Sequence, residues 1–216
     1  MGIKIRRKSE GIGGFSLKRK LTVNWKIIDK NHSFFDTPAD ESIIFGDPTT
    51  AKRSVSLREI NFLNFRLLKP KCLKTSAENQ HKIIDGQLFK QKFSDLSDDL
   101  EMIGTFCAWA PTLPRNESLF LQLAGLQPDG VYEIALFFIN KKELGATKIL
   151  LGEKKEEFDT SEKSETILMG NFIAPKETIE IEISSGDEKP PFLNAYALRR
   201  TGYEARSKIV AAVPRT

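Results

Sequence analysis

The chain has 216 residues, of which 40% are hydrophobic and 29% are charged, and its formal net charge is +4. This length suits one large domain, and the composition is typical of a globular protein rather than a disordered one. No run of eighteen apolar residues predicts a membrane-spanning helix, and no apolar segment follows the basic first residues as it would in a secretory signal peptide. We therefore expect a cytoplasmic protein or a subunit of an assembled particle, unless a signal has been removed.

The positive charge is concentrated at the N-terminus. Residues 1–30 carry nine basic and two acidic side chains, a net charge of +7, whereas the rest of the chain carries 24 basic and 27 acidic ones, a net charge of −3. Glycines between two basic clusters predict a flexible arm over residues 1–20. Such an arm is either a solvated tail or a contact for an anionic partner, such as nucleic acid or a neighbouring subunit. The residues that would make this contact are Arg6, Arg7, Lys8, Lys18, Arg19 and Lys20.

The first half of the body contains several short strand patterns. Residues 21–29 alternate apolar and polar side chains, which is the period of a half-buried strand. Residues 41–45 form a short apolar run that ends at a Gly-Asp-Pro turn. Residues 55–70 keep no single period and predict one or two strands with a bend. Residues 81–93 carry Asp-Gly between two apolar pairs, which predicts a hairpin.

The second half contains seven segments of about seven to nine residues, each bounded by turn-forming residues. In one of them, residues 178–184, three isoleucines alternate with threonine and glutamates, as in an antiparallel strand with one wet face. The segment 131–139 is apolar on both faces, which predicts a central strand covered on both sides. The polar residues 153–164 predict a solvated loop or a short turn. Many short strands with few helical patterns predict an antiparallel β-sandwich over residues 21–200, followed by a tail at 201–216.

Two motifs narrow this prediction. A Gly-Leu-x-Pro-x-x-x-Tyr turn at Gly125 to Tyr132 leads into the central strand, and a closing strand carries Leu193, Asn194 and Leu198. With the order of segments over residues 102–200, these motifs resemble the galactose-binding-like β-sandwich, the jelly roll of many carbohydrate-binding modules. The resemblance implies a non-catalytic module that binds carbohydrate. The basic arm and the lack of an export signal favour an alternative, a structural subunit of a virion or another large complex.

A sugar site needs an exposed aromatic ring that stacks on the apolar face of a pyranose, with planar polar side chains beside it. The aromatic residues considered for this role are Trp109, Tyr132, Tyr196 and Tyr203. Trp109 precedes a proline-rich loop that would present it at an edge of the sandwich, although packing in the core is the alternative. The predicted ligand contacts are Trp109, Tyr132, Asn194 and Tyr196.

The sequence offers little support for an enzyme. His32 and His81 have no metal-ligand spacing to each other or to a cysteine, and there is no P-loop or Gly-x-Ser-x-Gly motif. The acidic run at residues 95–101 is read as a solvated face, with a calcium site as the alternative. Cys72 and Cys107 are read as two buried thiols, with a single disulfide as the alternative. We therefore predict no catalytic residue, no metal and no cofactor.

Overall fold

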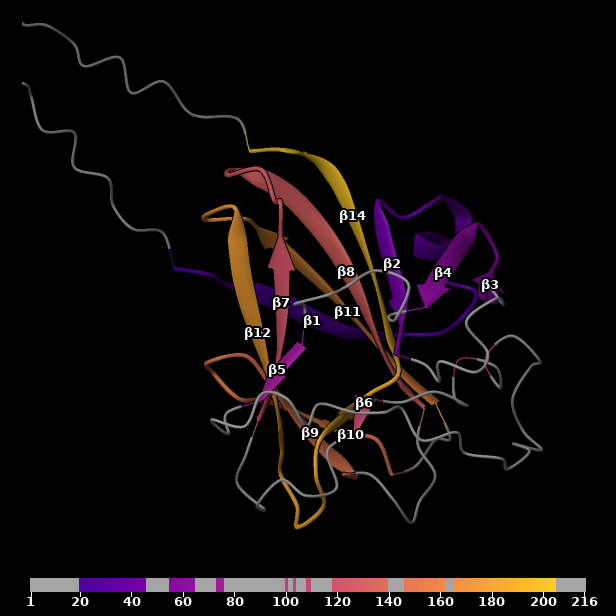
Figure 1. The fold of residues 1–216 in the computed structure, drawn as a ribbon, viewed down its shortest axis with the longest axis vertical. Helices are drawn as coiled ribbons and strands as arrows, with labels where there is room; N and C mark the ends of the chain where they lie inside the picture. Colours follow the sequence, from indigo (N-terminus) through magenta and orange to yellow (C-terminus); the bar gives the residue numbers. More distant parts are fainter. Residues whose placement is uncertain are drawn as a thin grey trace, which may run out of the picture.

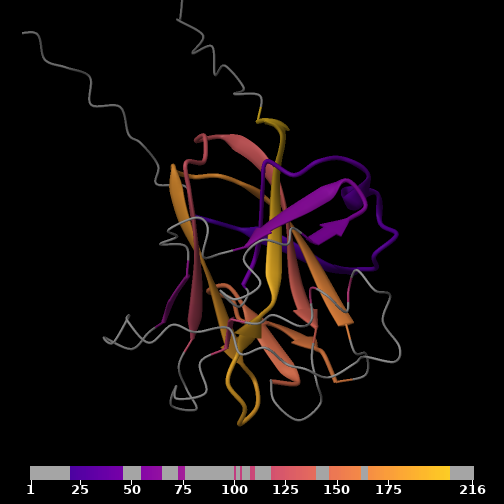
Figure 2. The same cartoon turned by 45° about the vertical axis from the view of Figure 1, so that its right-hand side comes forward.

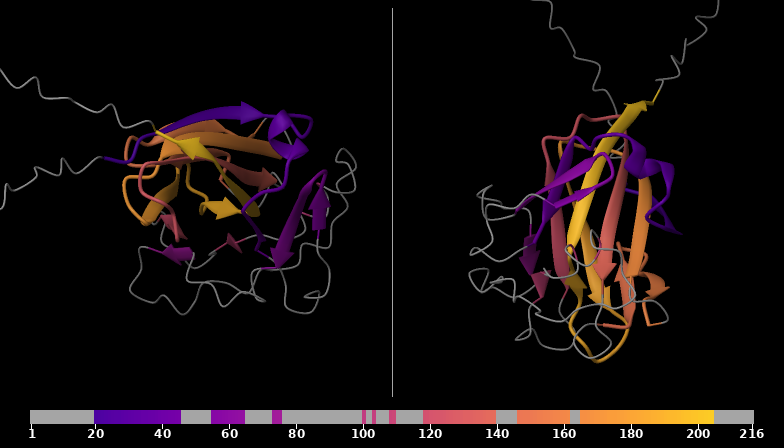
Figure 3. Two further views of the ribbon diagram at one scale, coloured as in Figure 1. Left: turned by 90° about the horizontal axis from the view of Figure 1, so that it is seen from above. Right: turned by 90° about the vertical axis from the view of Figure 1, so that its right-hand side faces the viewer.

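The computed structural model describes residues 20–45, 55–64, 73–75, 100, 103, 108–109, 118–139, 146–161 and 165–204. Among these residues the regular structure is β, apart from the 3-10 helix η1 and two isolated helical residues, Leu100 and Ile103 (Figure 1). Two sheets, mostly antiparallel, form a sandwich-like body whose longer strands run side by side along its long axis (Figure 3). The prediction of an all-β, sandwich-like chain is therefore confirmed.

The larger sheet has seven strands among the described residues, in the order β1-β11-β8-β14-β2-β4-β3. Within it, β2 and β4 are parallel and the other neighbours are antiparallel. The bounds of its strands are β1 Val23–Ile28, β11 Glu165–Ile173, β8 Gly130–Ile139, β14 Ala195–Tyr203, β2 Glu41–Ile44, β4 Ile60–Asn64 and β3 Val55–Leu57.

The smaller sheet has five strands within the described ranges, in the order β10-β9-β12-β7-β5. Its strands are β10 Glu156–Asp159, β9 Lys148–Leu151, β12 Thr178–Ser185, β7 Leu119–Ala124 and β5 Leu73–Thr75. A separate two-stranded ladder pairs β13, Phe192–Leu193, with β6, Ala108–Trp109. Strand β10 corrects the expectation of a loop in residues 153–164. It forms because a four-residue edge strand can pair with β9 while most of its side chains stay exposed.

Most of the other strand predictions are also confirmed. The segment 55–70 contains two strands, β3 and β4, joined by a turn at Arg58, which has a φ of 53°. In β12 the isoleucines Ile179, Ile181 and Ile183 are buried, and Glu180 is exposed on the other face. Strand β14 continues to Tyr203, three residues beyond the predicted boundary at 200. The described residues do not include the predicted hairpin at 81–93, the carboxylates of the acidic run 95–101, either cysteine, His81 or the arm up to residue 19.

The central strand β8 is buried on both faces, as its sequence predicts, but the sandwich covers only one of them. Ile134, Leu136 and Phe138 face the smaller sheet in a core that both sheets share. Ala135, Phe137 and Ile139 face the opposite way, into a second core. Full burial of a large apolar side chain contributes about 1.5–3 kcal/mol to the free energy of unfolding. Both faces of β8 therefore stabilise the fold.

The second core is covered by η1, Ser33–Asp36, and by the β3–β4 hairpin. Figure 2 shows η1 and the β3–β4 end of the larger sheet on the side away from β7 and β12. The ring of Phe137 lies 5.3 Å from that of Phe62 and 6.0 Å from that of Phe35, centroid to centroid. His32 caps η1, since its Nδ1 accepts the N–H of Phe34 at 3.1 Å. This cap helps to hold the two phenylalanines of η1 over the sheet.

The loop after β12 is fastened by Asp187. Its carboxylate accepts hydrogen bonds from the backbone N–H and the hydroxyl of Thr147, both at 2.5 Å, and from the Ser185 hydroxyl and the Lys189 N–H. Burial by itself raises the pKa of Asp187, but these donors outweigh it and hold the pKa below its ordinary value. The ionised carboxylate therefore stabilises the loop. Its full contribution is present when the pH is above the ordinary pKa of an aspartate.

Candidate functional site: a groove at the open edge of the sandwich

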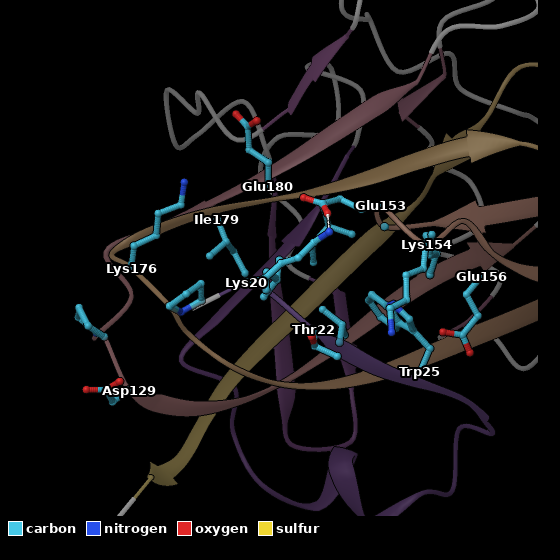
Figure 4. Close-up of a pocket in the computed structure, with 17 residues that line it drawn as sticks. Lys20, Thr22, Trp25, Asp129, Glu153, Lys154, Glu156, Lys176, Ile179 and Glu180 are labelled. Carbon is cyan, nitrogen blue, oxygen red and sulfur yellow. Dashed lines mark ion pairs between the residues drawn. The ribbon is translucent and has the colours of Figure 1, made fainter. Parts of the chain in front are cut away.

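A groove of about 950 Å³ lies where the edge strand β1 passes the end of the smaller sheet. Four stretches of chain line it: the start of β1, the β7–β8 turn, the β9–β10 hairpin, and the β11–β12 turn with the first half of β12. Figure 4 shows side chains from these stretches around one opening. The groove forms because β1 is the outermost strand of its sheet, and the described part of the smaller sheet leaves its inner face partly open.

The floor of the groove is apolar. Leu151, Ile179 and Ile181 are each 1% exposed and belong to the core between the sheets. Trp25 packs against the same core but is only partly buried. A Cβ added to Gly170, the residue opposite Trp25 in β11, would come within 2.6 Å of the indole ring. The absence of a side chain at Gly170 therefore lets the ring lie close to the sheet, with part of its surface open to the groove.

The rim of the groove is charged, with both signs present. Its charged residues are Lys20, Lys154 and Lys176, and Asp129, Glu153, Glu156 and Glu180. The Nζ of Lys20 lies 2.5 Å from Oε2 of Glu153, and both side chains are about 70% exposed (Figure 4). An exposed pair of this kind contributes little to stability. Because the two signs alternate around the rim, the groove does not favour a ligand of high charge of either sign.

Local turns place several of these rim residues. In the β9–β10 hairpin, Gly152 and Lys155 both have positive φ, at 68° and 51°, and the tight turn carries Glu153 and Lys154 on the groove side. In the β7–β8 turn, Tyr132 Oη accepts the N–H of Gln127 at 2.8 Å. The tyrosine of the Gly-Leu-x-Pro-x-x-x-Tyr motif thus fixes the turn that brings Pro128 and Asp129 to the rim.

Three of the four ligand contacts predicted from the sequence lie in the core. Tyr132 is 5% exposed, and its ring stacks on Phe172 with centroids 5.5 Å apart. Asn194 is 1% exposed, and its Oδ1 accepts the N–H of Ile139 at 2.8 Å. Tyr196 is fully buried, and its hydroxyl donates to the Glu41 carboxylate. With so little exposed surface, these three side chains support the fold and do not offer a platform for a ligand in this structure.

The remaining predicted site residues are placed as follows. Trp109 lies in β6 opposite Phe192, but its side chain is outside the described part of the structure. Of the six basic residues assigned to an anionic partner, Lys20 alone lies within the described ranges, where it lines the groove. Tyr203, which the sequence also offered as a stacking ring, is 59% exposed.

Sequence reasoning missed Trp25. The pattern of residues 21–29 predicts its strand, and an inward-facing tryptophan would ordinarily be read as a core residue. Its partial exposure follows from the position of β1 at the edge of the sheet, which depends on the pairing of β1 with β11, about 145 residues later in the chain. No local pattern encodes that pairing.

No group of histidines, cysteines and carboxylates among the described residues is arranged to hold a metal ion. The described helical residues include no segment long and apolar enough to cross a membrane. His32 has a local role, because one ring nitrogen caps η1 and the other lies 3.3 Å from Lys26 Nζ.

No protein-family model matches the chain, and comparisons with curated proteins and with solved structures find no match either.

Proposed function

We propose that the chain is a non-catalytic jelly-roll module that binds carbohydrate in the groove beside β1. The observation that carries this proposal is the partly exposed ring of Trp25 on an apolar floor with a polar rim. The apolar face of a pyranose stacks on such a ring, while its hydroxyls bond to charged and polar groups around it. A rim of mixed sign suits a ligand rich in hydroxyl groups better than one with many charges of a single sign.

The strand connections support the jelly-roll part of the proposal. From β7 onward the chain passes repeatedly between the sheets: β7, the β9–β10 hairpin and β12 belong to the smaller one, and β8, β11 and β14 to the larger one. Repeated crossing of the chain between two antiparallel sheets is typical of jelly rolls. This arrangement also agrees with the resemblance of residues 102–200 to galactose-binding-like modules.

Binding to an array of immobilised glycans tests the proposal. We expect wild-type protein to bind at least one class of glycan and Trp25→Ala to lose most of that binding, because a stacking ring contributes about 0.5–1.5 kcal/mol beyond its buried area. Ile27→Ala is the matched control. Ile27 lies on the same strand and is 55% exposed, but it does not line the groove. Equal binding by Trp25→Ala and wild type, with both folded by circular dichroism, would refute the assignment of the groove.

A second function, in an assembled particle, is favoured by the positions of Lys20 and Glu204. Lys20 lines the groove together with Asp129, and the N–H of Glu204 donates to the Asp129 carbonyl at 2.9 Å. The segments beyond these points therefore join the body at the same end. Residues 1–19 have a net charge of +5 and residues 205–216 of +3. Two basic segments at one end would suit a contact with nucleic acid or an acidic neighbouring subunit.

Light scattering after size exclusion, at low and high salt, separates the two functions. The assembly function predicts oligomers or co-purifying nucleic acid that disappear when residues 2–19 are deleted or when salt is raised. A monomer under all of these conditions would leave the carbohydrate module as the sole proposal.

A further inference from the structure

Strand β14 carries two consecutive arginines that differ in one respect. Arg199 and Arg200 lie on opposite faces of the strand, and each guanidinium stacks on an aromatic ring. The Cζ of Arg199 lies 4.8 Å from the centroid of Phe34, and that of Arg200 lies 5.0 Å from the centroid of Tyr203. Among the described residues, the first guanidinium forms an ion pair with a carboxylate and the second does not.

Arg199 is satisfied internally. Its Nη2 donates to Oε2 of Glu133 at 2.6 Å, and its Nη1 donates to the carbonyl of Phe34 at 3.3 Å. The side chains of Arg199 and Glu133 are only 19% and 22% exposed. This arginine therefore joins β8, β14 and η1, and its charge is neutralised in place.

Within the described part of the chain, the Arg200 guanidinium makes its hydrogen bonds through a single nitrogen. Its Nη1 donates to Oε1 of Gln127 at 2.5 Å and to Oη of Tyr203 at 2.8 Å. Asp40 accepts the backbone N–H of Arg200, but no ion pair among the described residues includes the Arg200 guanidinium. A guanidinium has five N–H donors, and its Nε and Nη2 edge is the fork that matches a carboxylate. In Arg200 that edge makes no hydrogen bond to any described residue.

The same contacts hold Tyr203 in place. Its hydroxyl donates to Gln127 and accepts from Arg200, while its ring remains 59% exposed. An exposed ring that is already held by hydrogen bonds loses little conformational entropy when a ligand stacks on it. Gln127 directly precedes Pro128 and Asp129 in the β7–β8 turn, and these two residues line the groove. The cluster of Gln127, Arg200 and Tyr203 therefore lies next to the groove, across one turn.

We propose that this cluster is a subsite for an acidic sugar, a uronic acid unit of the ligand whose neighbouring units occupy the groove. The Arg200 fork binds the carboxylate through two N–H donors, Tyr203 stacks on the pyranose, and Gln127 offers its amide N–H groups to a hydroxyl. This inference rests on the proposed carbohydrate function and specifies the chemical class of the ligand. A single uronic acid unit brings one charge, which matches the one open guanidinium of Arg200, and neutral neighbouring units suit a groove of mixed sign.

The test compares two probes of equal length by isothermal titration calorimetry: a neutral oligosaccharide that ends in a single uronic acid unit, and the methyl ester of that unit. We expect wild type to bind the acid at least about tenfold more tightly, the effect of one charge-assisted hydrogen-bonded contact. Arg200→Lys keeps the charge but loses the fork, so most of this preference should disappear. Tyr203→Ala should weaken binding of both probes. Lys148→Ala is the control for charge, because this exposed lysine pairs with Glu157 outside the groove.

Each alternative result has a definite meaning. Equal affinity of wild type for both probes, with binding still lost in Trp25→Ala, would overturn the acidic subsite and leave the carbohydrate function standing. An acid preference that survives in Arg200→Lys would overturn the role of Arg200. Binding of a glutamate-ended peptide as tightly as the uronic acid probe, unaffected by Tyr203→Ala, would overturn a sugar as the source of the carboxylate. Failure of all glycans on the array and of both probes would remove the proposed function and this inference together.

Discussion

The two faces of the larger sheet differ in how completely other parts of the chain cover them. On the outer side, η1 and the β3–β4 hairpin cover β8 with phenylalanines, and the charged pair at that side, Arg199 with Glu133, is largely buried. On the inner side, the smaller sheet covers the centre but leaves part of β1 open, and the charged pair there, Lys20 with Glu153, is about 70% exposed. The covered face contributes to stability through its buried side chains, whereas the open edge leaves the Trp25 ring and several charged side chains accessible to a ligand.

This comparison predicts the largest effect for a residue of the covered face. Phe137→Ala removes a fully buried ring that packs against two others. We expect the free energy of unfolding to fall by about 3–5 kcal/mol, because the lost contacts leave a cavity that the sheet cannot collapse to fill. Denaturant unfolding followed by circular dichroism measures it. A loss below about 1 kcal/mol would mean that the second core is loosely packed and that the contrast between the two sides is overstated.

An intermediate effect is expected where the open edge meets the sheet. In Gly170→Ala the new methyl group would come within 2.6 Å of both Trp25 and Val23, so the side chains of β1 must shift. We expect a loss of about 1–3 kcal/mol, together with a change in tryptophan fluorescence as the indole moves. Gly202→Ala is the matched control, since nothing lies within 4 Å of the added Cβ. An unchanged fluorescence spectrum in Gly170→Ala would show that Gly170 does not position Trp25.

The smallest effects compare the two ion pairs directly. Glu133→Gln removes the carboxylate from a pair whose side chains are about one-fifth exposed, and we expect a loss of about 1 kcal/mol. Glu153→Gln does the same to an exposed pair, and we expect a change of less than about 0.5 kcal/mol. Thermal unfolding at low and high salt ranks the two. If the order were reversed, the pair that bridges the groove would be a structural clamp rather than part of an open rim.

Much of the fold was predictable because the pattern of side chains within each segment is enough to indicate a strand. The alternation of Ile179, Ile181 and Ile183 with polar residues places one face inward, and the apolar run of β8 requires cover on both sides. The short strand β10 was not predicted, because its charged side chains are compatible with a loop until pairing with β9 satisfies its backbone.

The candidate site was predictable only in part. Tyr203 was named as a stacking ring and is exposed, whereas Tyr132 and Tyr196 were named for the same role and are buried. The difference lies in what each residue faces: Tyr196, the second residue of β14, packs in the core between the sheets, and Tyr203 is the last residue of the strand. Sequence identifies a tyrosine on a strand, but it does not show how far the opposite layer extends.

The sequence by itself determined the all-β class of this protein, most of its strands and the faces that they bury, because side-chain periodicity and turn residues act over a few positions. Only the tertiary structure decided which edge stays open, which arginine of β14 has a carboxylate partner, and where Trp25, Arg200 and Tyr203 lie relative to one another. Those features arise from pairing between segments far apart in the chain, such as β1 with β11 and β14 with β8. Such pairings are selected by the packing of the whole core and not by any single segment.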